Sequence, residues 1–121
     1  MLEGDRVTLQ HRRFKNVFGS GDVCGIPIAK TGGSARHQAP VVINNLIAVM
    51  EGKEPKSVYD GYTVCPLKVS YGKIMLIEFN YDGLAPTFPS LNPAEPRWLW
   101  WGFDLYMMKP MYRYLMLNGL M

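Results

Sequence analysis

Hydrophobic residues recur at helical spacing between residues 33 and 51, where an apolar stripe is formed by Val41, Val42, Leu46, Ile47 and Val49. The sequence therefore predicts one long helix in this range. Pro40 lies inside it, so we expect a kink or an irregular first part. Gly52 follows the last apolar position and is a typical C-terminal cap.

Two shorter apolar runs, over residues 62–67 and 73–79, predict β-strands. Tyr71-Gly72 stands between them as a turn, so we expect an antiparallel hairpin. Upstream, residues 16–19 read as a short buried strand that leads into a glycine-rich loop over 19–28. Residues 80–96 are predicted to be a loop because they contain Pro86, Pro89, Pro93 and Pro96.

Aromatic and methionine side chains crowd residues 98–117, where few positions are charged. Pro110 suits the first turn of a new helix, which predicts two short amphipathic helices. Such a stripe is commonly a core or a dimer face. Here the aromatic residues surround both helices, which favours a surface that lies in a membrane interface. The whole pattern predicts an α+β chain.

Composition narrows the class of protein. The 121 residues are 48% hydrophobic and 19% charged, which suits one small domain and excludes disorder. The net charge is +3 without a long basic run, so no nucleic-acid partner is expected. The polar N-terminus indicates no signal peptide, and no apolar stretch is long enough for a transmembrane helix. Cysteine and histidine spacing suits neither a disulfide scaffold nor a metal site.

Two segments carry candidate chemistry. Asp22 follows a glycine turn, where its carboxylate could accept hydrogen bonds from a sugar or ribityl hydroxyl, with Gly21 allowing close approach; the alternative is a simple cap. Cys65 lies in a strand and could act as a nucleophilic thiolate or as a small buried hydrophobe. Cys24 is interpreted as packing, and His37 as structural.

The run Tyr59-Asp60-Gly61-Tyr62-Thr63-Val64-Cys65-Pro66 closely resembles a segment of the sulfide:quinone oxidoreductases. Residues 16–22 resemble the second flavin-binding motif of two-dinucleotide-domain flavoproteins, although Lys15 stands where a proline is often found. Residues 25–38 resemble the segment that places a helix N-terminus beneath the flavin ring.

This resemblance implies a role for several residues. Cys65 is expected to be one of a redox pair beside the flavin, and FAD to be bound through Gly21, Asp22, Lys30, Thr31 and Gly32. A helix N-terminus and a cation would stabilise the negative charge of reduced flavin. Quinone contacts are expected from Val64, Tyr106, Met107, Met108 and Tyr112.

The resemblance also implies an organisation for the chain. Residues 1–52 would end the FAD-binding domain, 53–96 would carry the redox cysteine, and 97–121 would be a membrane-associated helix pair. The resemblance covers only the C-terminal third of the family. The first dinucleotide motif and the partner cysteine would therefore lie in the rest of the parent chain, and these residues alone are expected to be inactive and to lose FAD.

The expected substrates are sulfide and a membrane quinone, and the expected setting is a membrane surface with a homo-oligomer. Two alternatives remain open. A type II NADH:quinone dehydrogenase would share the Gly-Asp motif and the helices but would need no cysteine at position 65. A non-catalytic membrane-surface or dimerisation module would need neither Cys65 nor Asp22.

Overall fold

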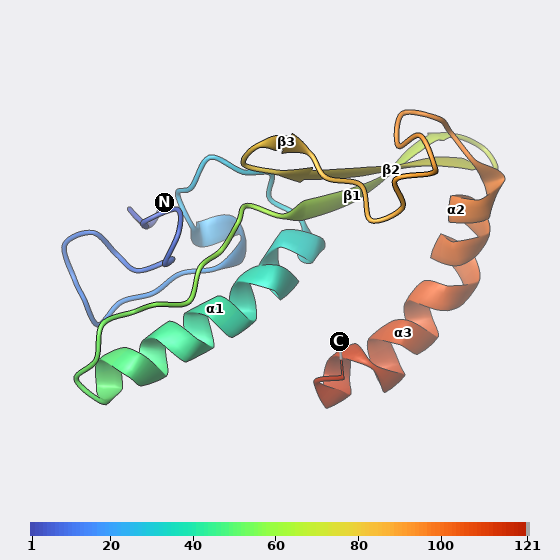
Figure 1. Cartoon of the computed structure of the whole chain (residues 1–121). Coiled ribbons are helices and arrows are strands. Elements are labelled where there is room, and N and C mark those ends of the chain that lie inside the picture. Colours follow the sequence, from blue (N-terminus) through green and yellow to red (C-terminus); the bar gives the residue numbers. More distant parts are fainter. Residues whose placement is uncertain (121) are drawn as a thin grey trace. The chain divides into compact units, whose positions relative to one another are not determined.

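The structure is a computed structural model that describes residues 1–120 of the chain (Figure 1). The described residues form two compact units. The first unit consists of Met1–Cys65 and Glu78–Ala85, and the second consists of Pro66–Ile77 and the segment from Pro86 onward. The α+β class predicted from the sequence is confirmed, because helices accompany a small antiparallel sheet.

Helix α1 spans Gly32–Met50 and matches the predicted long helix. Its last turn is closed by a Schellman motif, in which the Lys53 N–H donates to the Ala48 carbonyl at 2.8 Å and Gly52 adopts a φ of 72°. The glycine cap is therefore confirmed. The helix also runs through Pro40, so its first part is regular, contrary to one of the two expectations.

The buried face of α1 differs from the predicted apolar stripe. Only Val41 and Val42 of that stripe pack against the core cluster, and the fully buried positions of the helix are polar: Ser34, Gln38 and Asn45. Leu46 and Ile47 are exposed. Polar side chains can occupy a buried helix face where each is hydrogen-bonded, and the neighbouring loops supply those partners.

The sheet contains β1 (Thr63–Ser70), β2 (Lys73–Asn80) and β3 (Gly83–Leu84) in the order β1-β2-β3. The predicted hairpin with a turn at Tyr71-Gly72 is confirmed, and Gly72 has a φ of 75°. Strand β3 was not predicted. It pairs antiparallel to β2 through Phe79 with Leu84 and Asn80 with Gly83, since Gly83 adopts a φ of 128° that other residues avoid.

The N-terminal part of the first unit is mostly irregular. The strand predicted over 16–19 is wrong, because only Phe18 forms a bridge there, with Gln10. The chain then enters a short 3₁₀ turn, η1, at Gly21–Val23. The core lies where this region meets α1 and consists of Leu9, Cys24, Ile26 and Tyr59. Cys24 is fully buried, as its interpretation as packing requires.

The C-terminal helices belong to the second unit. They comprise α2 (Trp98–Gly102), a π-helical segment η2 (Phe103–Met107), α3 (Met108–Tyr114) and a short 3₁₀ turn η3 (Met116–Asn118). Two separate helices were predicted, but the backbone stays helical from α2 to α3. Pro110 does fall in the first turn of α3. In a regular helix the Pro110 ring would clash with the carbonyl four residues earlier. The turn that precedes Pro110 is a wider π turn, in which the Met108 N–H donates to the Phe103 carbonyl.

Candidate functional site

Cys65 is a free thiol near the start of β1, where it is half-buried. The segment before it is fixed by two contacts in the first unit. The Tyr59 hydroxyl donates to the Tyr62 carbonyl at 2.7 Å. Gly61 has a φ of 86°, and a Cβ added there would lie 2.6 Å from the Tyr81 ring. The Asp-Gly-Tyr sequence therefore matters for backbone conformation as well as for any chemistry.

Three hydroxyl groups join the N-terminus of α1 to the start of β1. Thr63 Oγ1 lies 2.9 Å from Thr31 Oγ1 and 2.5 Å from Ser34 Oγ. Ser34 in turn donates to the Ala29 carbonyl at 2.8 Å. Gly33 allows α1 and β1 to approach each other closely, because a Cβ there would lie 2.3 Å from a Val64 side-chain atom. The strand that carries Cys65 is thus held against the first turn of α1.

A buried acidic residue, Glu78, lies on β2, and sequence reasoning missed it. It is 4% exposed and accepts a hydrogen bond from the Tyr62 hydroxyl. The Tyr62 ring also lies against the His37 ring, with 4.3 Å between centroids. The signal in the sequence was a single glutamate within the otherwise apolar run Ile74-Met75-Leu76-Ile77-Glu78-Phe79.

His37 lies on α1 beside Arg36, whose guanidinium nitrogen is 3.0 Å from His37 Nε2. Burial lowers the pKa of His37, and the positive charge of Arg36 lowers it further, while Asp60 opposes the shift. The imidazole is therefore held in its neutral form around neutral pH. The imidazole ring of His37 packs against the phenol ring of Tyr62, in agreement with a structural role.

The candidate flavin residues of the glycine turn lie beside α1. The Gly21 N–H donates to Gln38 Oε1 at 2.7 Å, and a Cβ at Gly21 would lie 3.7 Å from that of Ala35. The Gly21 amide is thus engaged within the protein. Asp22, in contrast, presents an exposed carboxylate next to the first turns of the helix.

Lys30, Thr31 and Gly32 form the approach to α1. The Lys30 ammonium donates to the carbonyls of Cys24 and Ile26. Thr31 caps the helix by accepting from the Ser34 N–H at 3.1 Å. A Cβ at Gly32 would meet nothing within 4 Å, so there is open space beside the first residue of α1. An exposed carboxylate, an open helix N-terminus and a nearby cation suit a polyhydroxyl chain with an anionic edge, as FAD has.

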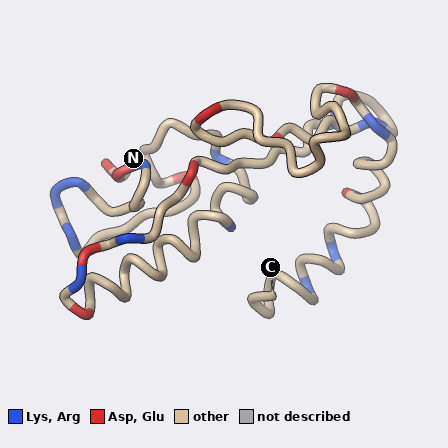
Figure 2. The backbone as a smooth tube through the Cα atoms, in the orientation of Figure 1, with Lys and Arg blue, Asp and Glu red and all other residues tan. Residues whose placement is uncertain are grey.

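The quinone candidates fall in both units. Val64 lies over Gly33 in the first unit. Tyr106, Met107, Met108 and Tyr112 lie on η2 and α3 in the second, where Tyr106 is 76% exposed. Figure 2 shows few charged residues along this helical segment. The described surface is accordingly apolar and aromatic, with further large exposed side chains at Trp98, Leu99, Phe103, Leu105, Tyr114, Leu115, Leu117 and Leu120.

The start of the helical segment is anchored to the hairpin tip within the second unit. Lys68 forms an ion pair with Asp104 at 2.9 Å and lies over the Trp101 ring, which also contacts Tyr71. Ile74 and Arg97 pair as an antiparallel bridge. These contacts hold α2 and the start of η2, whereas Tyr106 and Met107 of η2 and Tyr112 and Tyr114 of α3 are exposed.

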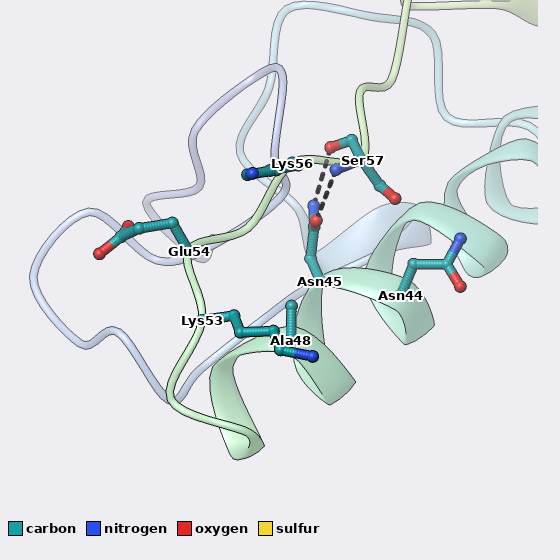
Figure 3. A pocket seen from close by; sticks show the side chains of 7 residues that line it. All are labelled: Asn44, Asn45, Ala48, Lys53, Glu54, Lys56 and Ser57. Atoms are coloured by element: carbon teal, nitrogen blue, oxygen red, sulfur yellow. Dashed lines mark hydrogen bonds between the residues drawn. The ribbon is translucent and has the colours of Figure 1, made fainter.

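A surface pocket of about 430 Å³ lies between the C-terminal half of α1 and the loop that follows it (Figure 3). The Asn45 amide crosses it, donating to the Ser57 carbonyl at 2.9 Å and accepting from the Ser57 N–H at 2.8 Å. None of the candidate residues lines this pocket, whose walls are Asn44, Asn45, Ala48, Lys53, Glu54, Lys56 and Ser57.

Two absences within residues 1–120 bear on the class of site. No helix in that range combines the length and apolar character that crossing a bilayer requires. Likewise, within the described part of the chain, no three His, Cys, Asp or Glu side chains are grouped so that they could hold a metal ion.

Comparison with curated proteins confirms the resemblance noted in the sequence. The chain is 34% identical over 119 residues, 98% of its length, to mitochondrial sulfide:quinone oxidoreductase of Mus musculus. It is 46% identical over 77 residues to the proteins of the same name from Dictyostelium discoideum and Schizosaccharomyces pombe. The match spans 26% of the mouse protein and 17% of each of the other two. No family model matches the chain.

A solved structure shares the fold. A chain in the cryo-EM structure of the Tetrahymena thermophila mitochondrial ATP synthase F1Fo tetramer matches with a TM-score of 0.82 and 26% sequence identity. The match covers 93% of this chain and 27% of that one. The same arrangement of elements therefore also occurs in a protein of a large mitochondrial assembly.

Proposed function

Because nearly the whole chain is homologous to about a quarter of a mitochondrial sulfide:quinone oxidoreductase, we propose that it forms the C-terminal region of such an enzyme. The parent enzyme would oxidise sulfide to sulfane sulfur and pass two electrons through FAD to a membrane quinone. In this proposal residues 1–52 end the FAD-binding domain, 53–96 carry the redox cysteine and 97–121 meet the membrane.

Cys65 is the proposed sulfur-handling residue. The single observation that carries this assignment is its position: a half-buried thiol on β1, held against the first turn of α1 by the three-hydroxyl cluster. A thiolate is both a nucleophile and a carrier of sulfur, so a cysteine is the residue that this chemistry needs. Its partner cysteine would come from the rest of the parent chain.

The flavin would lie beside the open N-terminus of α1. Bound FAD supplies the two-electron acceptor for the sulfur chemistry. Asp22 would accept hydrogen bonds from the ribityl hydroxyls, and the Gly32 amide would donate toward the flavin edge. Lys30, already held by two backbone carbonyls, would contribute its positive charge at a fixed place. Gly21 and Thr31 would support this geometry through their bonds to Gln38 and Ser34.

The quinone and the membrane would meet the second unit. Support comes from the exposed aromatic and methionine side chains of η2 and α3, since an apolar surface of this kind suits a quinone ring, an isoprenoid tail and a lipid interface. Contacts to quinone are proposed for Tyr106, Met107, Met108 and Tyr112, and for Val64 next to the redox cysteine. The same surface is proposed to support homo-oligomer formation.

The test of this function joins the chain to the N-terminal region of a sulfide:quinone oxidoreductase and replaces Cys65 by serine. Sulfide-dependent quinone reduction should be lost in Cys65→Ser and retained in the matched control Cys24→Ser, whose thiol is buried in the core. Full activity of Cys65→Ser would refute the assignment. The 121-residue chain itself is expected to show no activity and to release FAD, which flavin fluorescence after gel filtration would measure.

Membrane association has a separate test. The chain is incubated with liposomes, with and without residues 97–121, and both samples are floated on a density gradient. The longer protein should float and the shorter one should stay in solution. If both remain in solution, the helical segment is no membrane anchor.

A non-catalytic role in an assembly is the second candidate, and one specific observation favours it. A region of related fold belongs to a chain in the Tetrahymena mitochondrial ATP synthase structure, and this supports a role within an assembly. This candidate predicts that Cys65 and Asp22 can be replaced without consequence. A type II NADH:quinone dehydrogenase would likewise tolerate replacement of Cys65, but its activity would depend on NADH instead of sulfide.

A further inference from the structure

The register of the hairpin determines which side chain faces Cys65. A two-residue turn at Tyr71-Gly72 pairs Ser70 with Lys73 and, counting back along both strands, places Cys65 opposite Glu78. Three backbone hydrogen bonds agree with this register. The N–H and carbonyl of Ile74 bond to Arg97, and the Glu78 carbonyl accepts from the Ala85 N–H.

These bonds show that alternate residues of β2, at positions 74 and 78, turn their backbone groups away from β1. Cys65 and Glu78 are therefore a non-hydrogen-bonded pair, the closer of the two kinds of antiparallel pair. Their side chains lie on the same face of the sheet, with Cβ atoms about 4.5–5.5 Å apart. Both residues belong to the first unit.

The surroundings make this pair unusual for a hairpin. Glu78 is a buried carboxylate, whereas its neighbour Cys65 is only half-buried and remains open to a reactant. The Tyr62 hydroxyl donates to Glu78 Oε1 and thereby fixes the carboxylate. His37 packs on the Tyr62 ring from α1, with Arg36 beside it. Burial of a carboxylate is unfavourable without such partners.

We propose that Glu78 is the proton acceptor for the Cys65 thiol. The proposal rests on the proposed function only in taking Cys65 as the reacting sulfur. When Cys65 attacks a disulfide sulfur, its S–H bond breaks and the electron pair forms the new S–S bond. The attacked S–S bond breaks, its second sulfur leaves as a thiolate, and the proton passes to the Glu78 carboxylate. Tyr62 is a positioning residue, because it acts through Glu78.

The sign of one measurement separates this role from a simple charge effect. A carboxylate that only repelled the thiolate would suppress its formation, so its removal would speed the reaction. A carboxylate that accepts the proton speeds the reaction, so its removal slows it, typically by a factor on the order of 10² or more for general-base catalysis.

The experiment follows the reaction of the chain with a small aromatic disulfide that releases a coloured thiolate. A Cys24→Ala background leaves Cys65 as the reacting thiol. At pH 7, Glu78→Gln should lower the second-order rate constant at least tenfold, the lower end of what is expected. The matched control Glu54→Gln, which removes an exposed carboxylate elsewhere in the first unit, should leave the rate unchanged. An unchanged or faster reaction in Glu78→Gln overturns the proposal.

A second measurement needs no change at Glu78 and remains informative if that variant fails to fold. From about pH 6 to about pH 8, where an ordinary thiol is mostly protonated, attack by free thiolate speeds up roughly tenfold per pH unit. Transfer of the proton to Glu78 predicts a rate that is nearly flat across this range. A tenfold rise per pH unit would overturn the proposal. Neither assay uses sulfide, flavin or quinone, so each outcome is independent of the Cys65→Ser activity test.

Discussion

Replacing Gly61 by alanine tests how the strand that carries Cys65 is fixed. Gly61 has a φ of 86°, in the left-handed region, and its Cβ would lie 2.6 to 2.8 Å from three atoms of the Tyr81 ring. The Tyr81 ring cannot easily move, because its hydroxyl donates to the Arg6 carbonyl at 2.7 Å and its face meets the Arg6 guanidinium. Alanine would therefore meet two separate penalties.

The magnitude follows from adding these penalties. A left-handed conformation costs a non-glycine residue about 1–2 kcal/mol. Overpacking a close contact costs typically about 1–3 kcal/mol. Gly61→Ala should thus lower the free energy of unfolding by about 2–5 kcal/mol. Gly72 has a φ of 75° but nothing within 4 Å of its Cβ, so Gly72→Ala should lose only the first part.

The assay is urea unfolding followed by far-UV circular dichroism, to which the 19-residue helix α1 contributes strongly. Removing the ring in a Tyr81→Ala background should reduce the loss caused by Gly61→Ala to that of Gly72→Ala. Equal losses for Gly61→Ala and Gly72→Ala in the original background would refute the reasoning, because they would show that the ring contact contributes nothing.

Three further results are expected. Gly33→Ala should destabilise the chain by about 1–3 kcal/mol, because its Cβ would lie 2.3 Å from a side-chain atom of β1, while Gly32→Ala should be neutral or slightly stabilising in the same urea titration. Asn45→Ala should lower the free energy of unfolding by about 2–4 kcal/mol through the loss of three hydrogen bonds, which thermal unfolding would detect as a lower melting temperature, whereas the exposed Asn44→Ala should change either quantity little. Backbone donors lower the pKa of Asp5. The Asp5 carboxylate therefore stabilises the fold above the ordinary pKa of 3.8, and this stabilisation is lost as the pH falls through the lowered pKa. In Asp5→Asn, the midpoint of urea unfolding should therefore fall less steeply as the pH is lowered.

The long helix, its C-terminal cap and the hairpin turn could be predicted from the sequence, because each depends on residues that are close together along the chain. The cap at Gly52, the turn at Tyr71-Gly72 and the long helix between residues 32 and 50 follow from residue type and spacing, and the structure confirms each. The prediction of two separate helices at the C-terminus was less accurate. The proline at position 110 does begin a helical turn, but a π segment keeps the backbone helical, which residue type alone does not reveal.

The buried face of α1 could not be read in the same way. Hydrophobic periodicity assigns the interior to apolar positions, and Leu46 and Ile47 satisfied that pattern yet are exposed. Gln38 and Asn45 are buried instead, because hydrogen-bond partners from distant loops compensate their loss of water. Those partners lie 12 to 37 residues away along the chain.

By itself the sequence determined the family resemblance and the α+β class, and it singled out Cys65 as the candidate for the reacting sulfur. Motif and spacing are properties of neighbours along the chain, and they suffice for these conclusions. Only the tertiary structure decided what surrounds that sulfur. The pairing of β1 with β2 brings Glu78 opposite Cys65, and the folding of α1 onto β1 adds the hydroxyl cluster at Thr63. Side chains that are distant along the chain become neighbours only when strands and helices pack, so sequence spacing could not reveal the carboxylate beside Cys65.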